Sequence, residues 1–195
     1  MIGSLRGRLA GKLPPHVVVE CGGVGYELET PMSTFFGLPD AGAEVFLHTH
    51  LVVREDAHVL FGFSTVEERA LFRSLLKVSG VGAKIALGVL SAMSVRDFER
   101  CVRQEDVAML TKIPGIGRKT AERLIIEMRD RLDRGTPALT VVGRTVGSDA
   151  RAEAFDALIA LGYKPNEVQR LLGKIEVSGK SAEDIIRLAL RQAIA

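Results

Sequence analysis

Residues 1–63 alternate short apolar runs with turn residues, a pattern typical of β-structure. The apolar runs lie at 17–19, 26–29, 45–47 and 59–61, and the turn residues between them include Gly22, Gly23, Gly25, Pro39 and Asp40. A stretch at 32–37 is compatible with one short helix. About five strands in so short a segment predict a small closed barrel, because an open sheet would leave its edges unprotected.

The apolar period changes after Ser64 to one that predicts helices. Ser64 or Thr65 can cap a first helix, whose opening turn is acidic. Ser94 opens another helix in a near-capping box, with Asp97 in the place that Glu usually takes. A last long helix is predicted over 118–132.

The helical period is absent from residues 135–148, which are rich in glycine and are predicted to form a flexible linker. Residues 139–142 are apolar enough to form a strand instead. Helices resume over about 149–161, and Pro165 and Ser181 mark the starts of two more. A unit this small has a marginal core, which suggests that it binds something while tethered.

The net charge of +2 is small, but its distribution along the chain is uneven. Residues 1–63 hold 4 basic and 7 acidic residues, residues 64–134 hold 14 and 10, and residues 135–195 hold 8 and 7. The positive charge therefore lies in the middle segment. This is weak evidence for an anionic partner, since a solvated helical surface has the same composition.

Several other functions are not expected. No apolar run is long enough to span a bilayer, and the N-terminus lacks the features of a signal peptide, so a cytoplasmic protein is expected. Cys21 and Cys101 are predicted to be buried thiols. His48 and His50 can share one strand face, but no cysteine or carboxylate cluster accompanies them, so neither a metal nor another cofactor is expected.

The middle segment contains an internal repeat, in which every matched pair is offset by 35 residues. The first copy comprises Leu75, Val78, Gly80, Val81, Gly82, Lys84 and Ala86, and the second comprises Leu110, Ile113, Gly115, Ile116, Gly117, Lys119 and Ala121. One such turn is often only a tight connection between helices. Two matched copies, each with a lysine in the same place, favour a function.

Each copy predicts a helix, a Gly-apolar-Gly turn and a second helix. Val81 or Ile116 anchors the turn, and the glycines permit unusual backbone angles and close approach of a ligand. Free amides at the second helix's N-terminus then form an anion site, to which Lys84, Arg118 and Lys119 add charge. The expected ligand is a nucleic-acid phosphate, bound without base reading. Neither copy matches a P-loop or a dinucleotide fingerprint.

The tandem hairpins resemble helix-hairpin-helix DNA-binding domains, and the whole chain resembles the RuvA family of bacterial Holliday junction branch-migration subunits. The likeness is carried by the hairpins and by residues 1–7, 53–56 and 161–164. It implies an α+β multidomain fold. Its parts are an N-terminal OB-fold β-barrel (1–63), a tandem helix-hairpin-helix domain (64–134), a flexible linker (135–148) and a C-terminal three-helix domain (149–195).

The resemblance also implies partners. The family forms homotetramers, one or two per four-way junction, and recruits the hexameric motor ATPase RuvB; the resolvase RuvC is a further expected partner. The chain itself is expected to be non-catalytic. The implied DNA-binding residues are Gly80, Gly82, Lys84, Gly115, Gly117, Arg118, Lys119 and Arg123.

Two further sites are expected. Glu55 and Asp56 fall between two strands, where the residues alone indicate a solvated hairpin turn, whereas the resemblance implies an acidic pin at the junction centre. In the third segment, four apolar residues are candidates for an exposed motor-binding cluster. They are Leu158, Leu161, Tyr163 and Leu190. These four residues are almost as well explained as that domain's own core.

Two rival interpretations stay open. Residues 113–121 also resemble the hairpin of base-excision DNA glycosylases, with Asp133 at the place of their catalytic aspartate. Those enzymes use one hairpin inside a larger helical fold, whereas this chain has two hairpins after a β-rich segment. An RNA-binding or ribosome-associated adaptor is the other alternative, because OB barrels also bind RNA.

Overall fold

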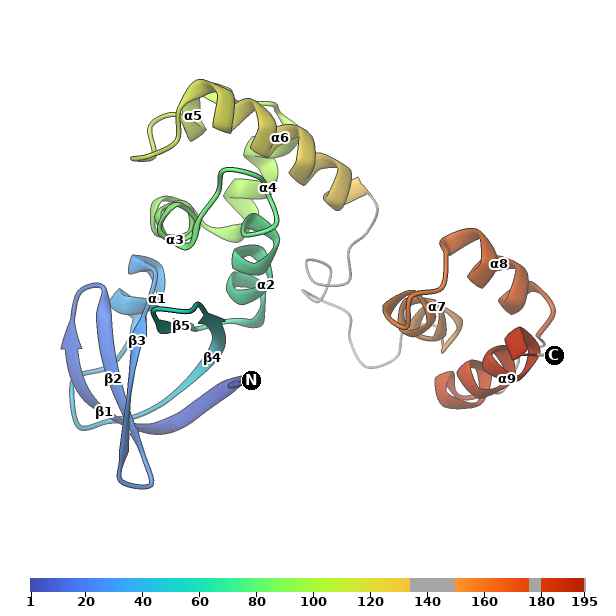
Figure 1. Ribbon diagram of the computed structural model, residues 1–195, viewed down its shortest axis with the longest axis horizontal. Coiled ribbons are helices and arrows are strands. Elements are labelled where there is room, and N and C mark those ends of the chain that lie inside the picture. Colours follow the sequence, from blue (N-terminus) through green and yellow to red (C-terminus); the bar gives the residue numbers. More distant parts are fainter. Residues whose placement is uncertain (134–149, 176–179, 195) are drawn as a thin grey trace. The chain divides into compact units, whose positions relative to one another are not determined.

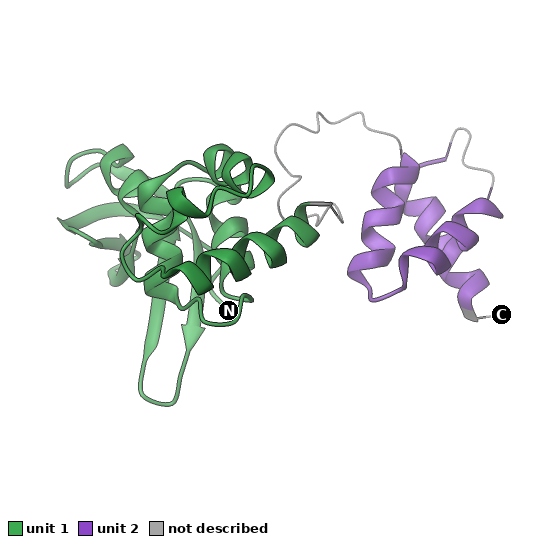
Figure 2. Ribbon diagram, turned by 90° about the horizontal axis from the view of Figure 1, so that it is seen from above, with its two compact units in different colours: residues 1–142 green, residues 143–195 purple. Residues whose placement is uncertain are grey.

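The computed structural model describes residues 1–133, 150–175 and 180–194. The chain divides into two compact units, residues 1–142 and 143–195, which are coloured separately in Figure 2. The predicted linker at 135–148, and the alternative strand at 139–142 within it, lie outside the described residues.

The first unit begins with a closed five-stranded barrel, as predicted (Figure 1). Its strands are β1 (Ser4–Leu13), β2 (His16–Cys21), β3 (Val24–Glu29), β4 (Glu44–Val53) and β5 (His58–Phe63), in the order β1-β2-β3-β5-β4. Only β3 and β5 pair in parallel; the other four neighbouring pairs are antiparallel. Alternate residues such as Val45 and Leu47 point into the core, as the period-two pattern requires.

Strand β1 was not among the strands that the apolar runs predict. Its ten residues carry Arg6, Arg8 and Lys12 together with two glycines, so its sequence has little β character. Gly7 has a structural reason, because a Cβ at this position would lie 2.1 Å from the Glu20 carbonyl oxygen. The strand is held by backbone pairing with β2 on one side and with β4 on the other. Strand β4 is distant from it in sequence. Between β3 and β4, the predicted short helix is present as α1 (Met32–Gly37).

Up to residue 133, where the description of the first unit ends, five helices follow the barrel. They are α2 (Val66–Leu75), α3 (Ala83–Ala92), α4 (Val95–Arg103), α5 (Val107–Leu110) and α6 (Arg118–Asp133). Thr65 caps α2 by accepting a hydrogen bond from the Glu68 amide. The four-residue α5 was not predicted, since one turn is too short to show an apolar period.

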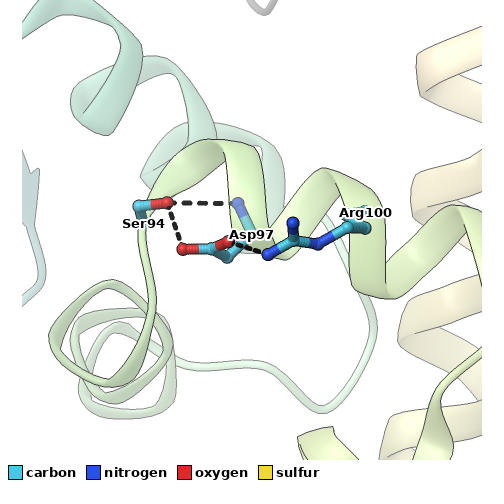
Figure 3. A network of polar contacts seen from close by, with 3 residues as sticks. All are labelled: Ser94, Asp97 and Arg100. Atoms are coloured by element: carbon cyan, nitrogen blue, oxygen red, sulfur yellow. Dashed lines mark hydrogen bonds and ion pairs between the residues drawn. The ribbon is translucent and has the colours of Figure 1, made fainter.

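The cap of α4 departs from an ordinary capping box (Figure 3). The Ser94 hydroxyl accepts from the Asp97 amide at 3.1 Å and donates to Asp97 Oδ2 at 2.7 Å. Arg100 pairs with the other carboxylate oxygen of Asp97. The shorter Asp side chain therefore contacts the hydroxyl of the capping residue, whereas a glutamate would contact its backbone amide.

One hydrophobic core joins β5 to the helices. The ring centroids of Phe61 and Phe63 each lie 4.9 Å from that of Phe72 in α2, and all three side chains are buried. The same core includes the hairpin residues Val78 and Ile113. The barrel and the helical repeat are therefore packed together within the first unit, and burial of this apolar surface stabilises their arrangement.

The described residues of the second unit form α7 (Ala150–Ala160), α8 (Pro165–Gly173) and α9 (Ala182–Ile194). Pro165 occupies the first turn of α8, and Ser181 caps α9 by accepting from the Asp184 amide at 3.2 Å, both as predicted. Buried residues from all three helices form its core. Among the described helices, none has both the length and the apolar character that crossing a bilayer requires.

Candidate nucleic-acid interface

The sequence repeat is also a structural repeat. In the first hairpin the Val81 amide donates to the Val78 carbonyl at 3.1 Å, and in the second the Ile116 amide donates to the Ile113 carbonyl at 3.0 Å. Gly80 and Gly115, the matched glycines, have φ of +85° and +86°. Both turns therefore need a residue without a Cβ at this position.

The four apolar anchors of the hairpins are buried. Val78, Val81, Ile113 and Ile116 are each no more than 5% exposed, while the glycines of both turns lie at the surface. The anchors hold each loop against the core, and the loop backbone is left accessible to a ligand. This arrangement is the one that the spacing of apolar and glycine residues predicts.

Each hairpin ends at a helix N-terminus with free amides. The first intrahelical hydrogen bond of α3 runs from the Ala86 amide to the Gly82 carbonyl, and that of α6 runs from the Ala121 amide to the Gly117 carbonyl. Gly82 has no side chain with which to cap α3. The amides of the first turn can therefore bind an anion, which the helix dipole also favours.

Basic side chains surround these two helix ends. Lys84, Arg118 and Lys119 are exposed there, and Arg118 also forms an ion pair with Glu122, from Nε to Oε1 at 3.0 Å. At both ends, backbone donors and a flexible cation can thus reach one phosphate together. The structure brings the predicted residues of each hairpin together.

A second matched pair of lysines escaped the sequence analysis. Lys77 and Lys112 are offset by the same 35 residues, directly precede the buried anchors Val78 and Ile113, and are exposed. Their amides make equivalent hydrogen bonds, to the Ser74 and Met109 carbonyls at 3.3 Å. Both lie inside the aligned repeat, between its first two matched apolar positions, so comparing every position of the two copies would have found them.

Arg123 has a different environment from the other predicted DNA-binding residues. Its Nη1 donates to the carbonyl of Ser79, in the first hairpin, at 3.3 Å. Arg123 belongs to α6, the helix of the second hairpin. This guanidinium therefore bridges the two copies of the repeat.

The predicted pin is the turn between β4 and β5. The Arg54 amide donates to the Ala57 carbonyl at 2.8 Å and closes the turn, at which Glu55 and Asp56 are exposed. A cavity of 410 Å³ lies between the base of this turn and α3. Its walls include Val52, Arg54, Val59, Ala83, Lys84 and Leu87. The pin strands and the first hairpin helix therefore border the same space.

His48 and His50 lie on the outer side of β4, as their alternation predicts. Arg73 Nε donates to His50 Nδ1 at 3.2 Å. Burial, followed by the charges of Arg73 and Arg69, lowers the pKa of His50, and burial with Arg69 likewise lowers the pKa of His48. Nowhere in residues 1–133, 150–175 and 180–194 do three His, Cys, Asp or Glu side chains gather as metal ligands would.

The predicted third-segment cluster is only partly exposed. Leu158 is fully buried in the core of the second unit, so it cannot belong to an exposed docking surface. Leu161 is 61% exposed, because it follows the last residue of α7 where Gly162, with φ of +99°, turns the chain. Tyr163 and Leu190 are half-buried against the core. Asp133, the catalytic candidate of the glycosylase interpretation, ends α6, and its side chain lies outside the described residues.

Three family models match successive parts of the chain. The RuvA N terminal domain matches residues 1–62, the SAM-like Helix-hairpin-helix tandem matches residues 72–130, and the RuvA C-terminal domain matches residues 149–193. The first and last of these matches name one family at the two ends of the chain.

Full-length relatives agree with these matches. The chain is 54% identical over 200 residues to the Holliday junction branch migration complex subunit RuvA of Thioalkalivibrio sulfidiphilus, and 54% identical over 200 residues to that of Methylococcus capsulatus. It is 51% identical over 203 residues to the subunit of the same name from Escherichia coli. Each comparison covers 100% of both chains. The chain therefore belongs to the RuvA family.

Proposed function

We propose that this chain is the non-catalytic, DNA-binding subunit of a branch-migration complex that acts in DNA recombination and repair. It binds four-way junction DNA, holds the junction open and recruits the motor ATPase RuvB. The observation that carries this proposal is the pair of matched hairpins, each with a positive-φ glycine, free helix amides and an exposed lysine. Relatives named as subunits of the Holliday junction branch migration complex support it.

The two hairpins bind phosphates of duplex arms. In the first, the backbone at Gly80 and Gly82 approaches the DNA while Lys84 supplies the charge. In the second, Gly115 and Gly117 approach it, and Arg118 and Lys119 supply the charge. Arg123, between the two, is a further phosphate contact. Such contacts position DNA without reading its sequence, which suits a protein that must move along any junction.

The acidic turn acts at the crossover. In a homotetramer on a four-way junction, four copies of Glu55 and Asp56 would place eight carboxylates near the centre. Within the described residues neither carboxylate has a cationic partner, so their charge is not neutralised locally. Repulsion between these carboxylates and DNA phosphates would let strands pass only once they have separated.

Each segment of the chain has a separate part in this function. Residues 1–63 form the tetramer and the junction centre, residues 64–134 grip the arms, and residues 135–148 tether residues 149–195, which dock the hexameric motor. Exposed Leu161 is the principal apolar contact of that docking surface, with half-buried Tyr163 and Leu190 beside it. The resolvase RuvC is a further partner of the assembled junction complex, and the complex works in the cytoplasm.

A truncated chain tests directly whether junction binding and motor docking lie in separate segments. A chain that ends near Arg144 should bind four-way junctions almost as well as the full chain, yet fail to stimulate branch migration by the partner ATPase. Migration supported by the truncated chain would place docking elsewhere. A Leu161→Asp variant of the full chain should show the same loss, with Gln169→Asp as a control at another exposed position of the second unit.

The same preparations address the rival interpretations. A glycosylase would release a base from damaged duplex, and an RNA adaptor would prefer structured RNA to four-way DNA in competition. The family match at both ends of the chain, together with two hairpins rather than one, favours the junction subunit.

A further inference from the structure

Helix α6 contacts the chain segment that leads into the first hairpin. Arg131 Nη1 donates to the Ser74 carbonyl at 2.9 Å, and its Nη2 donates to the Lys77 carbonyl at 3.4 Å. Two turns earlier on α6, Arg123 Nη1 donates to the Ser79 carbonyl at 3.3 Å. Residues eight apart lie near the same side of a helix, so both arginines face one strip of backbone.

The three carbonyls belong to residues 74–79, between the last turn of α2 and the Gly80 turn. Carbonyls at the end of a helix carry the negative end of the helix dipole and can accept further hydrogen bonds. A guanidinium with several fixed donors suits them, and Glu127 Oε2 lies 3.7 Å from Arg131 Nη2. Residues 74–79 are therefore tied to α6 at three points.

The first copy of the repeat has no arginine at the position matched to Arg123. The position matched to Arg123 is Gly88 of α3, where an added Cβ would lie 3.5 Å from Ile113 Cγ2. The first copy thus packs closely against the second hairpin, whereas the second copy holds the first hairpin through hydrogen bonds. Two equivalent turns are fixed in two different ways.

We propose that Arg131, assisted by Arg123, is a positioning residue for the first phosphate site. By holding the backbone at 74–79, the helix of the second hairpin orients the amides and Lys84 of the first. The two phosphate sites then keep a fixed separation, and DNA can bind both without the entropic cost of ordering the first hairpin. This inference rests on the proposed function of the hairpins. Arg131 acts through the first hairpin, since its side chain is 26% exposed and faces protein carbonyls.

A double-mutant cycle on the full chain tests it. Arg131→Met should weaken junction binding by roughly ten-fold, the scale of one hydrogen bond to a charged group. Its effect should be clearly smaller in a Lys84→Ala background, where the site that it orients is already impaired. In a Lys119→Ala background, Arg131→Met should still weaken junction binding by the full factor, because Lys119 belongs to the other phosphate site.

Salt dependence distinguishes positioning from contact. The slope of binding against salt should be unchanged in Arg131→Met, because no phosphate contact is lost. Arg131→Lys, which keeps the charge and a donor, should restore part of the affinity. Arg129→Met is the matched control: Arg129 lies on the same helix but pairs with Glu105, and its loss should show no selective coupling to Lys84.

Two results would overturn the proposal: equal coupling of Arg131 to Lys84 and Lys119, or a salt slope that falls by about one unit. If Arg131→Met does not fold, Arg131→Gln replaces it in the cycle, with the same selective coupling to Lys84 expected. Absence of junction binding by the wild-type chain would contradict the proposed function itself. Normal junction binding without selective coupling would contradict only this inference.

Discussion

At the residue scale, Lys84 and Lys119 are the cations that the repeat places at equivalent helix ends. Changing both to Ala should weaken binding to all DNA sequences to a similar extent, because phosphates carry no sequence information. The dependence of the binding constant on salt should flatten by roughly one unit per lost contact. A folded double variant with the wild-type slope would show that these lysines do not neutralise phosphates.

Gly80 and Gly82 make a matched pair for testing the turn. An Ala at position 80 has open space for its Cβ, but φ of +85° should cost about 1–2 kcal/mol in the free energy of unfolding. Gly82, with φ of −90° and equally open space, should accept Ala at almost no cost. Urea unfolding followed by circular dichroism compares them. Equal destabilisation would mean that the left-handed backbone is not the reason for Gly80.

His50 should make stability depend on pH. Its pKa in the folded chain is lowered, so the unfolded chain binds more protons at pH values below about 6.5. Stability should be full above that pH and should decrease as the pH falls through the folded pKa. His50→Asn can still accept from Arg73 but does not titrate, so its thermal midpoint should fall less between pH 7 and pH 5. The same fall in both proteins would assign the effect to other groups.

Burial of single side chains was the least predictable property at this scale. Leu158 and Leu161 are three residues apart, a spacing that places both on one helical face, yet one is buried and the other is 61% exposed. The difference arises because α7 ends at Ala160 and Gly162 turns the chain. The hairpin anchors were predictable because each is fixed twice, by the glycine turn and by the repeat.

At the element scale, strong local signals located most elements. Thr65, Ser94 and Ser181 mark helix starts in the sequence, and each accepts a hydrogen bond from an amide in the helix that follows. Strand β1 and helix α5 lack such signals. The first is held by its long-range pairs with β2 and β4, and the second is a single turn between two better-marked helices.

The predicted pin, the turn between β4 and β5, should affect DNA binding through its negative charge more than through the contacts of its side chains. Neutralising it with Glu55→Gln and Asp56→Asn should tighten binding to DNA, especially to plain duplex, because negative charge near phosphates is removed. Junction selectivity should therefore decrease. Titration of duplex and junction with both proteins measures this. Weaker duplex binding by a folded double variant would argue against a repulsive pin.

At the scale of the whole molecule, the sequence predicted the barrel and the paired hairpins, but not how they are joined. The shared core of Phe61, Phe63 and Phe72, and the hydrogen bonds from α6 to residues 74–79, arise from contacts between distant segments. The periodic pattern of apolar residues along the chain does not indicate such contacts. They matter for function, because they hold the barrel, the pin strands and both hairpins in one unit.

We propose that this unit recognises the four-way junction by its structure. The direct measurement is a gel-shift titration of a labelled four-way junction against linear duplex of equal length and shared sequence, at one fixed salt concentration. The junction should be bound clearly more tightly, and excess unlabelled duplex should not displace it. Equal affinity for the two DNAs would contradict junction recognition, leaving a protein that binds duplex phosphates without recognising the crossover.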